Sequence, residues 1–157
     1  MALLKALWLW SRQGAVAPVG GVGHDVAMDT TRSRASSGSP YEGTVGFSRA
    51  VRVGQHIAVS GTAPIWPDGH VSPDAGVQAR RCWEIALEAL GELGGRPEDV
   101  LRTRHFVTDT DVVDAIATVH GEVFGDIRPA STIVVVAGLV DSRWKVEVEL
   151  DAIVPSA

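Results

Sequence analysis

Charged side chains alternate with apolar ones along two segments that have the period-two pattern of β-strands. Three carboxylates occur at every second position between Lys145 and Val154, and they are Glu147, Glu149 and Asp151. Between Val100 and Thr108, Leu101, Thr103, His105 and Val107 fall on one face, and Arg102, Arg104 and Phe106 fall on the other. A carboxylate in a closed cleft can move protons, and arginine can bind a carboxylate through two parallel hydrogen bonds. Each segment is therefore expected to present its charged side chains on one face of a strand.

Other reactive residues have plainer interpretations. The histidines show no metal-ligand spacing, and the glycines occur at turns and form no phosphate-binding loop. Cys82 lies among the apolar positions of a helical segment, which predicts a small buried hydrophobe. Asp109, Asp111 and Asp114 fit a solvated helix N-terminus, where carboxylates favour the positive end of the helix dipole. These residues therefore predict no metal site and no phosphate-binding loop. The five histidines are His24, His56, His70, His105 and His120.

Composition bounds the class of protein. The chain has 157 residues, 45% apolar and 21% charged, which fits one globular domain with a core. The net charge of −5 argues against a nucleic-acid partner, because binding to phosphates needs clustered Lys and Arg. No apolar run reaches 18 residues, so we expect no membrane span and a cytoplasmic protein.

The first forty residues differ from the rest. Ala2–Trp10 is apolar apart from Lys5, 14–23 is rich in Gly, Val and Pro, and 29–39 is polar. Such segments bury too little apolar area to offset their ordering entropy. We therefore expect 1–40 to be an extension outside the fold, with Met28 a candidate start, and 41–157 to form the domain. An interfacial or partner-binding helix near Leu3–Trp10 is the alternative.

The remaining sequence alternates strands and helices. Ser72-Pro73-Asp74 provides helix-start residues, and Gly94-Gly95 provides a helix end. The helix between them has an apolar stripe at Val77, Cys82, Ile85, Ala86, Ala89, Leu90 and Leu93, and a second helix covers 112–124. The strands are predicted at Phe47–Val53, His56–Ser60, a short piece near His70-Val71, Val100–Thr108, Thr132–Leu139 and Lys145–Val154.

This order, β-β-(β)-α-β-α-β-β, predicts an α+β fold with one mixed sheet and two helices on one face. The near-continuous apolar run Thr132–Leu139 is typical of a strand covered on both sides. Ile133 and Val135 then suggest that a second subunit covers the other face of the sheet.

Several segments in this order resemble the Rid (YjgF-type) family of reactive-intermediate deaminases. They are Phe47-Ser48-Arg49-Ala50-Val51, Val59-Ser60-Gly61-Thr62, Gln78-Ala79-Arg80-Arg81, 104–109, Phe124 with Arg128-Pro129-Ala130-Ser131-Thr132, and Val146-Glu147-Val148-Glu149. The resemblance covers roughly Tyr41 to Pro155. It implies a chorismate-mutase-like fold and a homotrimer with ligand clefts between subunits. It also implies cofactor-free hydrolysis of 2-imino acids to 2-oxo acids and ammonia.

The resemblance implies a role for Glu149 in orienting the attacking water. The family's carboxylate-binding arginine follows a Pro-Ala pair, and here that position is Ser131. Arg104 and Arg128 are the candidate replacements. Arg104 could instead form a structural ion pair with Glu147 or Glu149, and Arg128 could instead be a solvent-exposed loop charge. The other expected ligand contacts are Phe47, where a tyrosine hydroxyl is lost, Gly61, Thr132 and Ile133.

Two functions follow as hypotheses. The first is hydrolysis of a small imine or enamine metabolite in an intersubunit cleft, with an altered substrate class. The second is a non-catalytic trimer that binds a metabolite, which the absence of the arginine at Ser131 favours. In both, the partners are a small molecule and two further copies of the chain.

Overall fold

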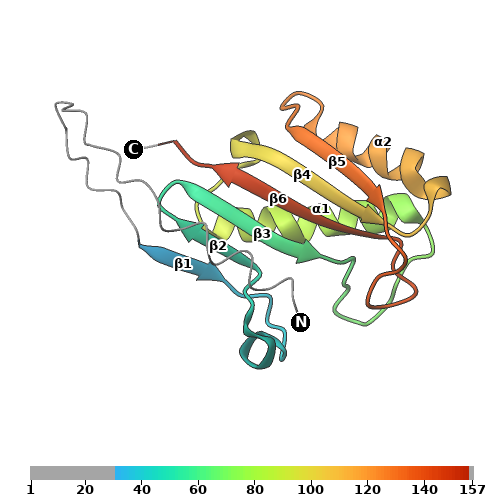
Figure 1. Cartoon of the computed structure of the whole chain (residues 1–157), viewed down its shortest axis with the longest axis horizontal. Helices are drawn as coiled ribbons and strands as arrows, with labels where there is room; N and C mark the ends of the chain where they lie inside the picture. The colour runs from blue at the N-terminus through green and yellow to red at the C-terminus, as the bar shows by residue number, and fades with distance from the viewer. Residues whose placement is uncertain (1–30, 156–157) are drawn as a thin grey trace, which may run out of the picture.

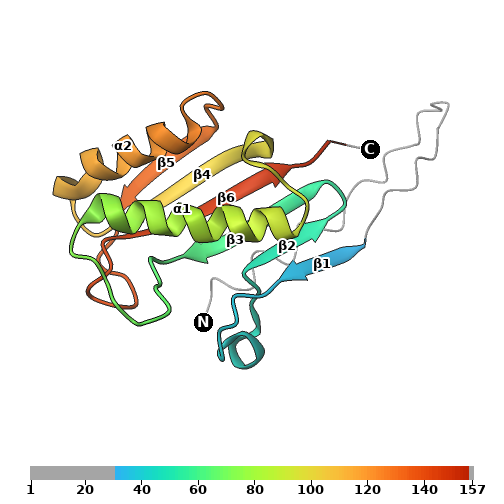
Figure 2. The same cartoon turned by 180° about the vertical axis from the view of Figure 1, so that it is seen from behind.

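The computed structural model describes residues 31–155, which form a six-stranded mixed sheet with two helices on one face. Figure 1 looks onto the uncovered face of the sheet, and Figure 2 shows the helices across the other face. The strand order is β1-β2-β3-β6-β4-β5; β4 and β5 are parallel and all other pairs are antiparallel. The predicted α+β architecture is confirmed. The strands are β1 Arg32–Ala35, β2 Ala50–Val53, β3 His56–Thr62, β4 Val100–Val107, β5 Ala130–Val135 and β6 Val146–Ile153.

The sheet begins earlier in the chain than the sequence predicts. β1 pairs antiparallel with β2, and the side chain of Ala35 is buried against the core. Residues 32–35 were expected to lie outside the domain, and that boundary was wrong. The expectation failed because the backbone of an edge strand can pair without an apolar period of its own. The apolar segment Ala2–Trp10 and Met28 lie outside the described residues.

The hairpin of β2 and β3 turns at Gly54, whose φ of +58° lies in the region that glycine adopts without strain. A π-helical turn, η1 (Glu42–Gly46), precedes β2, so Phe47 lies before the strand. The short strand expected at His70-Val71 is absent, because residues 63–74 form an irregular connection to the first helix.

The first helix, α1 (Ala75–Glu92), starts where the sequence predicts it. The Asp74 side chain accepts a hydrogen bond from the Val77 amide, which caps the N-terminus. Val77 itself is exposed, whereas Gln78 is fully buried. The Gln78 side chain donates to the Ser72 and Arg143 carbonyls and accepts from the Lys145 amide. A polar residue therefore anchors α1 to the segment that leads into β6.

The second helix, α2 (Val113–Phe124), packs beside α1, and the two helices enclose an aromatic cluster against β4. Trp83 lies 5.3 Å from His105 and 5.0 Å from Phe124, measured between ring centroids, and His120 borders all three rings. Cys82 is buried, as predicted, with its Sγ 3.8 Å from the Val146 carbonyl oxygen, and burial raises the pKa of its thiol. Two short 3-10 turns, η2 (Pro97–Asp99) and η3 (Thr110–Val112), lead into β4 and α2.

Strand β5 is an edge strand and is mostly exposed, which contradicts the expected cover on both sides. Ile133 and Val135 pair with His105 and Val107, whose side chains face the helices. The expectation that Ile133 and Val135 mark the uncovered face was therefore wrong. The residues of β5 that share the uncovered face of the sheet are instead Ala130, Thr132 and Val134.

His105 makes stability depend on pH. Burial lowers its pKa to about 4, although its Nδ1 donates to the Thr132 carbonyl over 3.1 Å. The unfolded chain therefore binds a proton at His105 more tightly than the folded protein does. The free energy of unfolding that neutral His105 contributes should decrease as the pH is lowered from about 6.5 to about 4. We predict that His105→Asn, whose amide can keep the bond to Thr132, loses free energy of unfolding less steeply over this range than the wild type.

Denaturant unfolding at a series of pH values measures this slope. The matched control is His70→Asn at an exposed histidine, which should keep the wild-type slope because its side chain contacts solvent. Equal slopes for His105→Asn and the wild type would contradict the assignment.

Candidate functional site

The uncovered face of β6 presents a row of carboxylates. Glu147, Glu149 and Asp151 alternate with buried apolar residues, so all three face away from the helices. Arg104 on β4 lies between two of them: its Nη2 is 2.9 Å from Asp151 and its Nη1 is 3.4 Å from Glu149. The ion pair expected for Arg104 is thus present with Glu149, and Asp151 is an additional partner. Arg104 and Glu149 are each about one-third exposed, so this pair contributes modestly to stability.

Glu147 lies in a different environment from its two neighbours. It is half-buried and forms no ion pair within residues 31–155. Burial raises its pKa, the negative charge of Glu149 raises it further, and Arg49 opposes both. A carboxylate whose pKa is raised is a stronger proton acceptor than an ordinary glutamate, which suits acid–base chemistry.

Gly61 leaves room for this carboxylate. β3 and β6 change register between Val59 and Thr62, and Gly61 lies within that irregular stretch. A Cβ atom at Gly61 would lie 2.2 Å from Oε1 of Glu147, so any side chain there would displace the carboxylate. Gly61 was expected in the site as a ligand contact, and the structure places it directly against Glu147.

Arg49 completes this corner of the sheet. Only 8% of the residue is exposed, and its Nη1 donates to the Gly61 carbonyl at 2.8 Å and to Thr62 Oγ1 at 3.0 Å. Burial lowers the pKa of Arg49, and the charges of Glu42 and Glu147 oppose that effect. Arg49, Gly61, Thr62 and Glu147 are called the Arg49 corner below.

The expected ligand contacts are divided between two faces of the sheet. Thr132 pairs with Arg104 on the uncovered face, whereas Ser131 pairs with the buried Thr103 on the helix face. Ile133 packs against the core on that same helix face. The three consecutive residues therefore do not form one binding surface within a single chain.

Arg128 and Phe47 lie on connecting segments. Arg128 follows α2 with a φ of +54°, and its Nε donates to the Gly125 carbonyl at 3.2 Å. Its side chain is exposed, as in the alternative of a loop charge. Phe47 is 37% exposed and precedes the start of β2 by three residues, on the same segment as Arg49.

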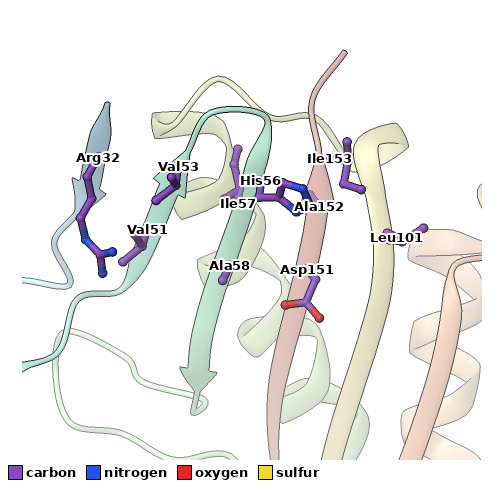
Figure 3. Close-up of a pocket in the computed structure, with 10 residues that line it drawn as sticks. All are labelled: Arg32, Val51, Val53, His56, Ile57, Ala58, Leu101, Asp151, Ala152 and Ile153. Carbon is purple, nitrogen blue, oxygen red and sulfur yellow. The ribbon is translucent and has the colours of Figure 1, made fainter. Parts of the chain in front are cut away.

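A shallow hollow lies on the uncovered face, away from the Arg49 corner. Figure 3 shows that it crosses β1, β2, β3 and β6 and reaches Leu101 on β4, and its lining includes Arg32, Val51, His56 and Asp151. A second hollow lies between the start of α1 and the segment before β6, and includes Ser72, Asp109 and Trp144. None of the expected ligand contacts lines either hollow. Among residues 31–155, no three His, Cys, Asp or Glu side chains are placed to hold a metal ion.

Comparisons with known proteins agree with the fold. The family described as Endoribonuclease L-PSP matches residues 39–154. A crystal structure from Mycobacterium tuberculosis, described as a member of the YjgF/YER057c/UK114 family, is 39% identical with a TM-score of 0.73, covering 79% of this chain and all of that one. A structure from Yersinia pestis, described as a protein of the conserved Rid family, is 26% identical with a TM-score of 0.69, covering 79% of this chain and all of that one.

Sequence relatives give the same result. An uncharacterized protein of Streptomyces coelicolor is 39% identical over 120 residues, which is 76% of this chain and 90% of the relative. A RutC family protein of Pyrococcus abyssi is 31% identical over 109 residues, which is 68% of this chain and 84% of the relative. The chain therefore belongs to the YjgF/Rid family that carries the L-PSP endoribonuclease description.

The role of Gly61 can be tested by adding a single methyl group. We predict that Gly61→Ala folds with a loss below about 1 kcal/mol, because the end of the Glu147 side chain can move. The displaced carboxylate should then lose its raised pKa as it moves toward solvent. Thermal unfolding and NMR titration of the Glu147 carboxyl carbon measure the two effects.

Gly91→Ala is the matched control, since a Cβ at this position of α1 meets nothing within 4 Å. That variant should gain about 0.5–1 kcal/mol from helix propensity and leave Glu147 unchanged. An unchanged Glu147 titration in Gly61→Ala would show that the close approach does not control the carboxylate.

Proposed function

We propose that this protein hydrolyses a small imine, or the imine form of an enamine, to a carbonyl compound and ammonia. The observation that carries the proposal is the half-buried carboxyl of Glu147, whose pKa is raised where β3, β6 and Arg49 meet. Water would add to the imine carbon, and one of its protons would pass to the nitrogen, which gives a carbinolamine. The remaining hydroxyl proton would then pass to the nitrogen as the C–N bond breaks, leaving a C=O bond and ammonia. One carboxylate that accepts a proton and returns it in each step is sufficient for both transfers.

Glu147 is proposed as the proton carrier. The resemblance had assigned the water-orienting role to Glu149, but the ion pair with Arg104 engages that carboxylate. Glu147 has no such partner within residues 31–155, and the negative charge of Glu149 makes it a better proton acceptor. In this proposal the charge of Glu149 raises the pKa of Glu147, and Glu149 does not itself contact the substrate.

We also propose a homotrimer whose subunits complete the site. The uncovered face and the edge strand β5 present apolar side chains that a second copy would bury; Leu101, Val134, Val53 and Ile153 are all more than one-third exposed. Thr132 on β5 shares that face with Arg104. A cleft between copies would enclose the Arg49 corner and exclude bulk water, which strengthens its electrostatics.

A matched pair of variants tests the assignment. We predict that Glu147→Gln lowers kcat for ammonia release at least ~100-fold, the range of general acid–base catalysis, and that Glu149→Gln lowers it less than ~10-fold. The substrates are 2-iminopropionate and a series of bulkier imines generated in situ, each corrected for spontaneous hydrolysis. Light scattering checks that both variants keep the wild-type mass.

The opposite order of the two variants would return the role to Glu149. If the wild-type protein binds imine analogues without accelerating their hydrolysis, the result would contradict the enzyme proposal and support the non-catalytic, metabolite-binding trimer. That second candidate is favoured by Ser131, since no arginine stands at that position of β5.

A further inference from the structure

Arg49 is buried with only part of its hydrogen-bonding capacity used. Nη1 makes the two bonds to Gly61 and Thr62, whereas Nε is inaccessible to solvent and has no hydrogen-bond partner within residues 31–155. Buried polar groups are nearly always paired, and an unpaired N–H on a charged group is especially costly. Within residues 31–155 the guanidinium of Arg49 therefore lacks a hydrogen-bond acceptor for its Nε–H.

The unused donors lie together on one edge of the guanidinium. Guanidinium is planar, and Nε–H points in parallel with one N–H of Nη2. That edge matches the two oxygens of a carboxylate, which it binds through paired hydrogen bonds. Neither hydrogen bond that anchors Arg49 uses this edge, because both come from Nη1. The guanidinium is therefore held through Nη1, and its Nε–Nη2 edge makes no hydrogen bond within residues 31–155.

We propose that Arg49 binds the carboxylate of a small ligand through Nε and Nη2, and so supplies the cation that Ser131 does not. The inference rests on the proposed function in that it places the ligand beside Glu147. Ligand oxygens would satisfy the buried Nε–H once the side chains that cover it shift.

The other arginines near the expected site are engaged elsewhere. Both terminal nitrogens of Arg104 contact carboxylates, at Glu149 and Asp151. Arg128 is exposed and its Nε donates to the Gly125 carbonyl. A ligand would have to displace an ion pair to use Arg104, and would gain little from a solvated Arg128.

The surrounding charges restrict the ligand. Glu42 and Glu147 both act on Arg49, so a second negative charge on the ligand would be repelled. An N–H group beside the carboxylate would instead donate a hydrogen bond to ionised Glu147, and a carbonyl there would accept one from the protonated carboxyl. The corner therefore fits a monocarboxylate with an adjacent imine or carbonyl better than a dicarboxylate or a phosphate.

Binding can be measured without turnover, using 2-oxobutyrate as the probe and neutral 2-oxobutanamide as its matched analogue. We expect the carboxylate to bind wild type at least tenfold more tightly than the amide. Arg49→Lys keeps the charge but loses the planar edge, so it should bind 2-oxobutyrate at least tenfold more weakly. Arg80→Lys is the control, because Arg80 is exposed and pairs with Glu122 between the helices. It should bind as wild type does.

A second measurement avoids the risk that Arg49→Lys misfolds. In ¹⁵N-labelled wild type, the Nε–H resonance of Arg49 should shift on saturation with 2-oxobutyrate. An unmoved resonance, or equal affinities for the acid and the amide, would overturn the inference. Binding through Arg49 without any imine hydrolysis would refute only the proposed function. Hydrolysis that is unaffected in Arg49→Lys would refute only this inference.

Discussion

The alternation of side chains along β6 is the constraint on which both the core and the site depend. β6 lies between β3 and β4, with Val146, Val148 and Leu150 fully buried beneath the helices. Each residue between these points to the opposite face, which brings Glu147 and Glu149 side by side. A shift of one residue would place carboxylates in the core and valines on the uncovered face. The hydrophobic effect that positions α1 therefore also fixes the register of the acidic row.

The two ends of that row are in different electrostatic states. Arg104 pairs with Glu149 and Asp151 across the strands, whereas Glu147 is left against Gly61 near a buried arginine. Burying charge without complete pairing lowers stability, and natural proteins retain such arrangements mainly where they serve function. The Arg49 corner has both features, a raised carboxyl pKa and an incomplete guanidinium. These features support a binding and proton-transfer site at this place in the sheet.

Much of the fold was predictable because it depends on local periodicity. The Asp74 cap, the apolar stripes of both helices and the alternation of β4 and β6 all appear directly in the sequence. β1 was missed because its pairing depends on the backbone, and the faces of β5 were misassigned because a continuous apolar run has no period. Gln78 was missed because its burial depends on the Arg143 carbonyl, 65 residues away, and on the Lys145 amide.

The site was less predictable, because it depends on contacts across strands. Arg49 lies in a segment that was recognised for its resemblance, yet nothing local marks it as buried. Glu147 and Glu149 are equivalent in the sequence pattern, and only the approach of Gly61 and the reach of Arg104 distinguish them.

The most direct test of the central claim is a ¹³C NMR titration of the Glu147 carboxyl carbon in the wild-type protein. The account predicts a midpoint above the ordinary glutamate value of 4.5, and a lower midpoint when Glu149→Gln removes the neighbouring charge. A wild-type midpoint at or below 4.5 would contradict the account, because burial and the charge of Glu149 would then not make Glu147 a stronger base than an ordinary glutamate.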